Sequence, residues 1–215
     1  MKKELIINKL NTLIVILAGG QSKRFGGGYK TLYKFNNKSL LDRILKNLGK
    51  LDIEIALNVN SNENEFTKTS LNLIKDEFVN FQGPLAGIYS SMNWALKNKK
   101  DVEWIFTTPS DTPFLNSSLV DKFLINKYLN NTKIILARTS NKIHPVIGFW
   151  HVSLLKNLEN FLEKDSRKIM HWVEQQNYEL LNFENKNYFF NINSKSDLEE
   201  AIKIEKSIKL PKFTG

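Results

Sequence analysis

The chain has 215 residues, of which 41% are hydrophobic and 25% charged, a composition that excludes a fibrous or disordered protein. Its net charge of +9 is spread along the chain without a dense cluster, so we expect solvated surface, some attraction for anionic substrates, and no nucleic-acid partner. The absence of cysteine excludes disulfides and thiolate metal sites. No apolar run approaches the ~18 residues of a membrane span, so we expect one cytoplasmic domain over residues 1–215 with no membrane partner.

The first element is a buried strand at Leu13 to Ala18, where six apolar residues, rich in β-branched side chains, follow one another. Five of the ten glycines then lie between Gly19 and Gly28, in a loop that also carries Lys23 and Arg24, and Lys30 follows it. Glycine lets the main chain approach phosphate oxygens, and cations supply charge-assisted bonds. Neither the Walker nor the dinucleotide pattern fits the loop. We therefore predict a polyphosphate-binding loop of another kind, with a flexible surface turn as the alternative.

The rest of the first half alternates between helices and strands. In chain order we expect a helix capped by Ser39 and ended by Gly49, strands at 53–59 and 71–74, a helix opened by Pro84, and a strand at 102–108. This alternation is typical of a parallel sheet with right-handed crossovers.

The second half is less regular. We expect a helix at 118–128, strands at 133–137 and 143–150, helices at 153–163 and 167–175, strands at 178–183 and 188–192, and a last helix with a capping box at 196–199. The predicted fold is a three-layer α/β/α sandwich around a mainly parallel, mixed sheet, with an antiparallel excursion in this half.

Polar residues stand where the predicted strands of the first half end. The glycine loop follows the first strand, Asn58 ends the second, Asp76 follows the third and Asp111 follows the fourth. Ligands of open α/β sheets bind at this edge, so these segments are expected to meet in one crevice. Prolines two residues away on either side fix the backbone at Asp111, which makes it the candidate ligand for the Mg²⁺ of a nucleoside triphosphate.

The candidate phosphate contacts are Lys30 as a point charge and Arg24 as a bidentate group. Alternatives stay open for each residue: an Asx-turn or a helix cap before Phe114 for Asp111, no functional role for Asp76, whose backbone nothing fixes, and solvated surface for Lys30 and Arg24. The three histidines form no metal pattern, and His144 is the one that could line a second substrate's pocket.

Five motifs, in order, resemble those of the molybdenum cofactor guanylyltransferases. They are L-A-G-G-x-S-x-R-F-G-G-x-x-K from Leu17, Q-G-P-L-A-G-I from Gln82, S-D-T-P-F from Ser110, H-P-V-I-G-F-W from His144 and N-I-N-S-K-S-D-L from Asn191. The resemblance implies a Rossmann-like nucleotidyltransferase fold, with a nucleotide half at 12–115 and a cofactor half at 116–210. It also implies transfer of GMP from Mg-GTP to molybdopterin cofactor with release of pyrophosphate, and carrier proteins or target molybdoenzymes as partners.

The resemblance also implies roles for individual residues. The residues that contact GTP would be Leu17, Ala18, Gly19, Lys30, Asn58, Asp76 and Asp111. The catalytic residues would be Arg24, Lys30 and Asp111, and Asp111 would also be the Mg²⁺ ligand. The residues that contact molybdopterin would be Arg24, Asn191 and Asn193. Two positions depart from the family pattern, since Tyr29 stands where Asp is usual and Ser110 where Cys is common. Related cytidylyltransferases show L-A-A-G, so Gly19 is hypothesised to leave room for a purine.

Two alternative functions remain open at this point. One is a nucleotidyltransferase of the same fold that uses CTP, or a sugar or alditol phosphate acceptor. The other is a non-catalytic module that binds GTP or carries the cofactor. A phosphate monoester nucleophile, with a second pKa near ~6, is already ionised at pH 7, so the enzyme hypothesis requires no general base.

Overall fold

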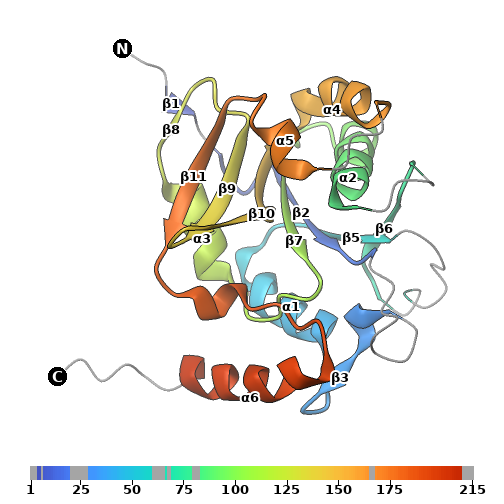
Figure 1. The fold of residues 1–215 in the computed structure, drawn as a ribbon. Helices are drawn as coiled ribbons and strands as arrows, with labels where there is room; N and C mark the ends of the chain where they lie inside the picture. Colours follow the sequence, from blue (N-terminus) through green and yellow to red (C-terminus); the bar gives the residue numbers. More distant parts are fainter. Residues whose placement is uncertain are drawn as a thin grey trace.

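The computed structural model describes residues 4–5, 7–19, 29–59, 66, 69–78, 83–164 and 168–209, and the fold is built on one seven-stranded sheet (Figure 1). The strands are β2 (Thr12–Leu17), β5 (Ile55–Val59), β6 (Asn72–Lys75), β7 (Trp104–Pro109), β9 (Ile134–Thr139), β10 (Lys142–His151) and β11 (Tyr178–Phe183). Their spatial order is β11-β9-β10-β7-β2-β5-β6. Only β10 runs antiparallel to its neighbours, which confirms the predicted mainly parallel sheet with one excursion.

Helices cover both faces of this sheet. They are α1 (Leu40–Leu48), α2 (Pro84–Asn98), α3 (Ser117–Ile125), α4 (Leu155–Leu162), α5 (Ile169–Val173) and α6 (Lys195–Lys209). Short 3₁₀ turns are η2 (Lys30–Leu32), η3 (Gly49–Leu51), η5 (Val152–Leu154) and η6 (Lys186–Phe189). Two small antiparallel ribbons pair β1 (Glu4–Leu5) with β8 (Tyr128–Leu129), and β3 (Lys34–Phe35) with β4 (Lys38–Ser39). Among the described helices, none is both long and apolar enough to cross a membrane.

The alternating side chains of β2 divide the core into two layers. Ile14 and Ile16 pack in one cluster with α1 and α3, whereas Leu13 and Val15 pack in the other with α2, α4 and α5. All four are fully buried, as expected for a strand covered on both faces. Figure 1 shows the resulting three layers, with α6 and the β3–β4 ribbon forming a further unit beyond α1.

Most predicted elements are confirmed, but the strand expected at 188–192 is wrong. This segment begins in the 3₁₀ turn η6, because the Asn185 side chain accepts a hydrogen bond from the Asn187 amide at 3.0 Å. It then runs without strand pairing to Ile192, whose amide donates to the Asp111 carbonyl at 2.9 Å. Its apolar side chains therefore pack inward from a connection rather than from a strand of the sheet.

The cap of the last helix lies two residues earlier than the sequence pattern indicates. The Asp197 carboxylate accepts from the Asn193 amide at 2.7 Å and from the Ser194 amide at 2.8 Å, and the Ser194 hydroxyl accepts from the Asp197 amide at 3.4 Å. The capping box is thus Ser194 with Asp197, and Ser196 only bonds the Ser194 hydroxyl. The hydrogen bond from the Asn193 amide is the main reason why the pKa of Asp197 is lowered.

We expect Asp197→Ala to destabilise α6 by about 1 kcal/mol, the usual cost of a lost cap. The matched control is Ser196→Ala, which leaves both backbone bonds in place and should cost far less. Because the folded pKa of Asp197 is lowered, its contribution is present at neutral pH and lost as the pH falls through that pKa. Urea unfolding at neutral and acidic pH checks this, and a larger effect for Ser196→Ala would contradict it.

Candidate functional site

The carboxyl ends of four parallel strands meet at one edge of the sheet. Backbone bonds tie them together: the Ala18 amide donates to the Asn58 carbonyl at 2.8 Å, and the Ser110 amide donates to the Leu17 carbonyl at 3.0 Å. The Asp76 amide donates to the last carbonyl of β5 at 3.2 Å. The chain builds β2, β5 and β6 to one side and then returns to place β7 on the other side of β2, which is the switch point where such folds bind ligands.

Lys30 and Asp111 form an ion pair at this edge. The Lys30 ammonium lies 2.8 Å from Asp111 Oδ2 and also donates to Asn193 Oδ1 at 2.6 Å. The side chains of Lys30 and Asp111 are 14% and 21% exposed, so the pair is shielded but open to a ligand. Lys30 thereby joins Asp111 and Asn193, which lie 81 and 163 positions from it in the sequence.

Buried hydroxyls beside the ion pair hold its two segments together. The Thr31 hydroxyl donates to the Ser110 hydroxyl at 2.8 Å, and the Thr112 hydroxyl donates to Asn191 Oδ1 at 3.0 Å. Thr31 and Thr112 are fully buried. Neither threonine is among the candidates from the sequence, although each directly follows a charged candidate and a buried hydroxyl requires a hydrogen-bond partner. Ser110, in place of the family's common Cys, supplies one of these partners.

A second polar group forms between β5, β6 and α2. The Asn58 amide group donates to Asp76 Oδ1 at 2.8 Å and to the Ile74 carbonyl at 3.2 Å. Asn58 is only 2% exposed. Burial raises the pKa of Asp76, and the hydrogen bond from Asn58 opposes that shift. The Asp76 carboxylate is therefore partly buried, and a hydrogen bond fixes one of its oxygens.

Gly87, in the first turns of α2, allows the helix to lie close to Asn58. A Cβ at Gly87 would lie 2.4 Å from Asn58 Oδ1 and 3.2 Å from Leu17 Cδ2. The helix, which Pro84 opens at its first turn, therefore brings its N-terminal end against the ends of β2 and β5. The positive end of a helix dipole at that position favours an anionic ligand.

The two groups contain most of the residues that the sequence singled out. Lys30, Asp111, Asn191 and Asn193 gather in the first, and Asn58 and Asp76 in the second. Between the two groups, Leu17 ends β2, and Ala18 and Gly19 follow it. Arg24 and Lys23 lie outside the described residues.

Tyr29, the main departure in the loop motif, is buried at the start of η2. Its ring meets the ring of Phe66 edge-on, with centroids 4.9 Å apart at 71°. Phe66 is fully buried. Aromatic packing thus holds the residue that precedes Lys30, where the family usually has a carboxylate.

His144 lies in the interior rather than in the strand-end site. Its Nε2 lies 2.8 Å from the Thr139 hydroxyl, and its ring stacks on Phe189 with centroids 4.5 Å apart. Burial lowers the pKa of His144 to about 4, so the ring is neutral at pH 7. These contacts support a structural role.

Asp111 has the chemistry of a ligand for a metal ion that arrives with a nucleotide. In the described part of the chain, no three His, Asp or Glu side chains come together as a preformed metal site. Mg²⁺ needs only one or two carboxylates when phosphate oxygens and water complete its shell. A single, partly exposed carboxylate paired with a displaceable lysine fits that arrangement.

Comparison with known proteins identifies the family of this chain. The family model described as MobA-like NTP transferase domain matches residues 14–179. A molybdenum cofactor guanylyltransferase of Nitrobacter hamburgensis is 34% identical over 190 residues, covering 87% of this chain and 91% of the relative. A protein of the same name from Vibrio campbellii is 30% identical and covers 93% and 100%.

Solved structures share the fold. Molybdopterin-guanine dinucleotide biosynthesis protein A from Archaeoglobus fulgidus superposes with a TM-score of 0.73 at 19% identity, covering 91% of this chain and 99% of that one. A 4-diphosphocytidyl-2C-methyl-D-erythritol synthase from Anaerococcus prevotii gives 0.67 at 13% identity, covering 95% and 100%. Because the family model matches most of this chain, the chain belongs to the MobA-like NTP transferase domain family of nucleotidyltransferases.

Proposed function

We propose that this nucleotidyltransferase transfers GMP from Mg-GTP to the molybdopterin form of the molybdenum cofactor, releasing pyrophosphate. The relatives named molybdenum cofactor guanylyltransferase support both substrates. The observation that carries the proposal is the Lys30–Asp111 pair, which stands between the strand ends and the segment of Asn191 and Asn193.

In this proposal the nucleotide occupies the edge formed by β2, β5, β6 and β7. The backbone at Leu17, Ala18 and Gly19 and the N-terminal end of α2 face the phosphates, while Asn58 and Asp76 hold the nucleoside. Asn58 fixes one Asp76 oxygen, and no described residue donates a hydrogen bond to the other. Lys30 and Arg24 would bind the triphosphate as cations.

Catalysis in this site would rest on positioning and charge. Asp111 would hold the Mg²⁺ that accompanies GTP, and that ion, when bound, neutralises charge on the leaving pyrophosphate. The Lys30 ammonium can exchange its contacts with Asp111 and Asn193 for phosphate oxygens, since all are anionic or polar acceptors within its reach. The attacking phosphate is already ionised at pH 7, so no side chain needs to take a proton. Arg24, Asn191 and Asn193 would orient the molybdopterin.

The proposal predicts that Asp111→Asn lowers turnover at least ~100-fold while the protein stays folded, because a neutral amide neither holds the metal nor balances Lys30. Pyrophosphate release is measured with molybdopterin cofactor and, in separate reactions, Mg-GTP, Mg-CTP and Mg-ATP. The matched control is Asp101→Asn, at an exposed turn. Native turnover by Asp111→Asn would favour the non-catalytic module, and preference for CTP would favour the other nucleotidyltransferase.

A second prediction concerns the contact between α2 and Asn58. Gly87→Ala places a methyl group within 2.4 Å of Asn58 Oδ1, so the amide must move and Asp76 loses its fixed orientation. We expect kcat/KM for GTP to fall roughly tenfold or more through misplacement of the nucleoside. The control is Gly49→Ala, where a Cβ meets nothing within 4 Å.

A double-mutant cycle makes this assignment specific. In an Asn58→Ala background the added methyl group has no amide to displace, so Gly87→Ala should cost much less than it does alone. Equal costs in both backgrounds would show that the glycine matters for some other reason, such as the packing of α2 against Leu17.

The choice of base is tested at Gly19. If a missing Cβ leaves room for guanine, Gly19→Ala should weaken GTP binding more than CTP binding, measured by calorimetry with each nucleotide and Mg²⁺. An unchanged ratio of the two affinities would remove Gly19 from the basis of selectivity.

A further inference from the structure

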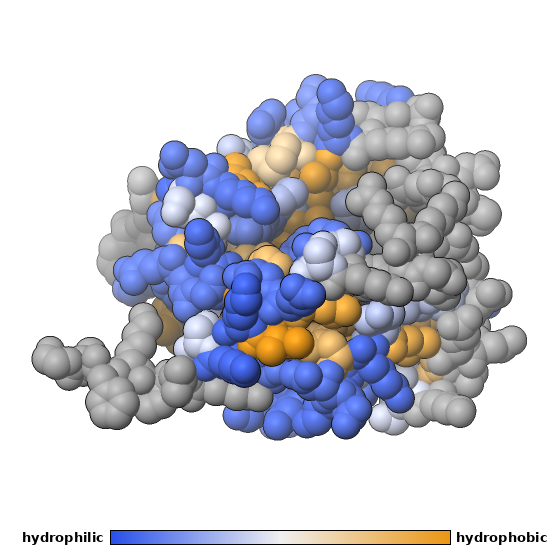
Figure 2. Space-filling model, turned by 60° about the horizontal axis from the view of Figure 1, so that its bottom comes forward, coloured by the Kyte–Doolittle hydropathy of each residue, from blue (hydrophilic) through white to orange (hydrophobic). Residues whose placement is uncertain are grey.

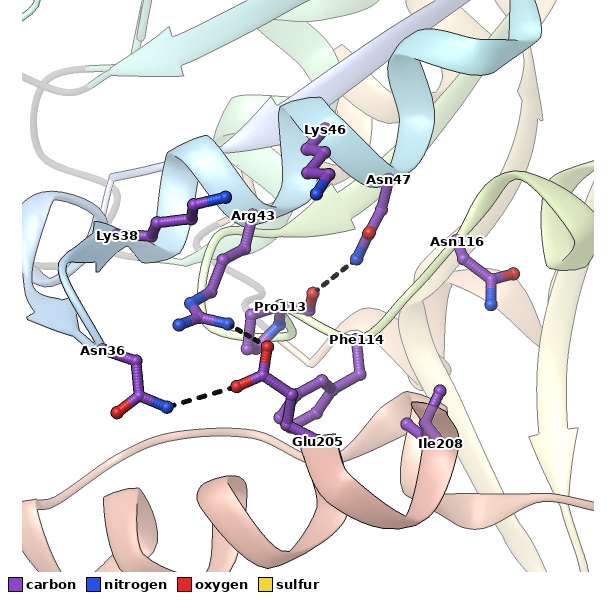
Figure 3. Close-up of a pocket in the computed structure, with 10 residues that line it drawn as sticks. All are labelled: Asn36, Lys38, Arg43, Lys46, Asn47, Pro113, Phe114, Asn116, Glu205 and Ile208. Atoms are coloured by element: carbon purple, nitrogen blue, oxygen red, sulfur yellow. Dashed lines mark hydrogen bonds and ion pairs between the residues drawn. The ribbon is translucent and has the colours of Figure 1, made fainter. Parts of the chain in front are cut away.

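A groove of about 340 Å³ lies beside the segment that follows Asp111. Its walls come from α1, the β3–β4 ribbon, the loop after Asp111 and the last turns of α6 (Figure 3). Lys30, Asn58, Asp76 and Asp111 do not line it. The groove is therefore separate from the strand-end site described above.

One wall of the groove is strongly cationic. Lys38, Arg43 and Lys46 line it, against a single carboxylate from Glu205. Arg43 Nη1 pairs with that carboxylate at 2.9 Å, which leaves the charges of the two lysines. In the part of the chain that the structure describes, neither lysine forms an ion pair. Figure 3 shows Arg43 reaching from α1 toward α6, with Lys38 and Lys46 to either side of it.

Arg43 is an incompletely satisfied buried cation. It is 8% exposed, its Nη2 donates to the Phe35 carbonyl at 2.7 Å, and its guanidinium lies 3.6 Å from the centre of the Phe35 ring. Its Nε is buried and has no hydrogen-bond partner in the described structure. A buried donor without a partner is costly unless a ligand or water supplies the acceptor.

The opposite part of the groove is apolar. Phe114 and Ile208 line it, and Phe114 is 7% exposed. Pro113 is held there because its carbonyl accepts from the Asn47 amide group at 2.9 Å. Figure 2, which turns the α6 side forward, shows apolar residues between hydrophilic ones on this face. The groove thus offers charge at one end and a hydrophobic contact at the other.

We propose that this groove is a second ligand site, for a small organic phosphate. The phosphate group lies among Lys38, Arg43 and Lys46, where the two lysine ammonium groups are the donors. The apolar body of the ligand packs on Phe114 and Ile208. The volume is at the lower end of that of small-molecule sites, which combine apolar lining with a few convergent polar groups. Glu205 does not oppose the anion, since Arg43 and the Asn36 amide group engage its carboxylate.

A ligand in this groove would contact Phe114, which packs against residues that hold the Asp111 backbone. Phe114 packs in one small cluster with Phe35, Leu40 and Ile192. Ile192 in turn donates its amide to the Asp111 carbonyl. The site is nevertheless defined by its own residues, and its existence does not depend on the function proposed for the strand ends.

The test is calorimetric titration with phenyl phosphate, at constant ionic strength and with saturating Mg-GTP to occupy the strand-end site. Phenyl phosphate should bind with one site per chain and more tightly than inorganic phosphate. Lys38→Ala combined with Lys46→Ala should weaken binding at least ~tenfold, since two charge-assisted contacts are lost. Ile208→Ser should weaken the binding of phenyl phosphate but not that of inorganic phosphate.

The controls separate this site from general attraction to a basic protein. Lys100→Ala removes an exposed lysine outside the groove and should leave the affinity unchanged. Lys46→Arg should retain most of the affinity, because the cation is kept. The proposal is overturned if Lys100→Ala weakens binding as much as the double variant. It is also overturned if Mg-GTP abolishes the binding, which would place phenyl phosphate at the strand ends. A protein that fails to bind GTP would refute the proposed function and leave the lysine comparison intact.

Discussion

The ion pair between Lys30 and Asp111 is the interaction on which the site depends. It joins the end of the glycine-rich loop to the end of β7, and through Asn193 it also joins both to the start of α6. A lysine held between a carboxylate and an amide oxygen keeps its charge near the strand ends before any ligand is present. If the proposed function holds, an incoming triphosphate would compete for that charge and free the carboxylate at the same time, so that binding the phosphates and preparing the metal ligand would be one event.

The group formed by Asn58 and Asp76, where the proposal places the nucleoside, depends on a steric constraint instead. Asn58 can turn toward Asp76 only because α2 presents no side chain at Gly87. The same glycine lets the N-terminal end of the helix reach the strand ends. The contact between Gly87 and Asn58 therefore affects two things, the packing of α2 on the sheet and the orientation of the Asp76 carboxylate at the strand ends.

Much of the fold follows from patterns that local physics determines. The buried run at Leu13 to Ala18 and the N-cap at Ser39 predicted the right elements, because burial on both faces and cap chemistry act over a few residues. The segment at 188–192 was misassigned because its apolar residues pack from a 3₁₀ turn and a connection, a tertiary outcome that alternation cannot distinguish from a strand. Thr31 and Thr112 escaped notice for a related reason, since their partners lie 79 residues away in each case.

The start of α6 shows how the second half of the chain acts on the first. Asp197 fixes the amides of Asn193 and Ser194, so the helix cap determines from where the Asn193 side chain reaches Lys30. After the Asn193 hydrogen bond and the other cap bonds, the charge of Lys30 also contributes to lowering the pKa of Asp197. Lys30 thus forms an ion pair with Asp111 and also acts electrostatically on Asp197. In the proposed reaction, phosphates would draw Lys30 away from the Asn193 side chain, while the cap bond to Asp197 would still hold the Asn193 backbone. The amide oxygen of Asn193 would then be available to the second substrate from a position that the cap has set.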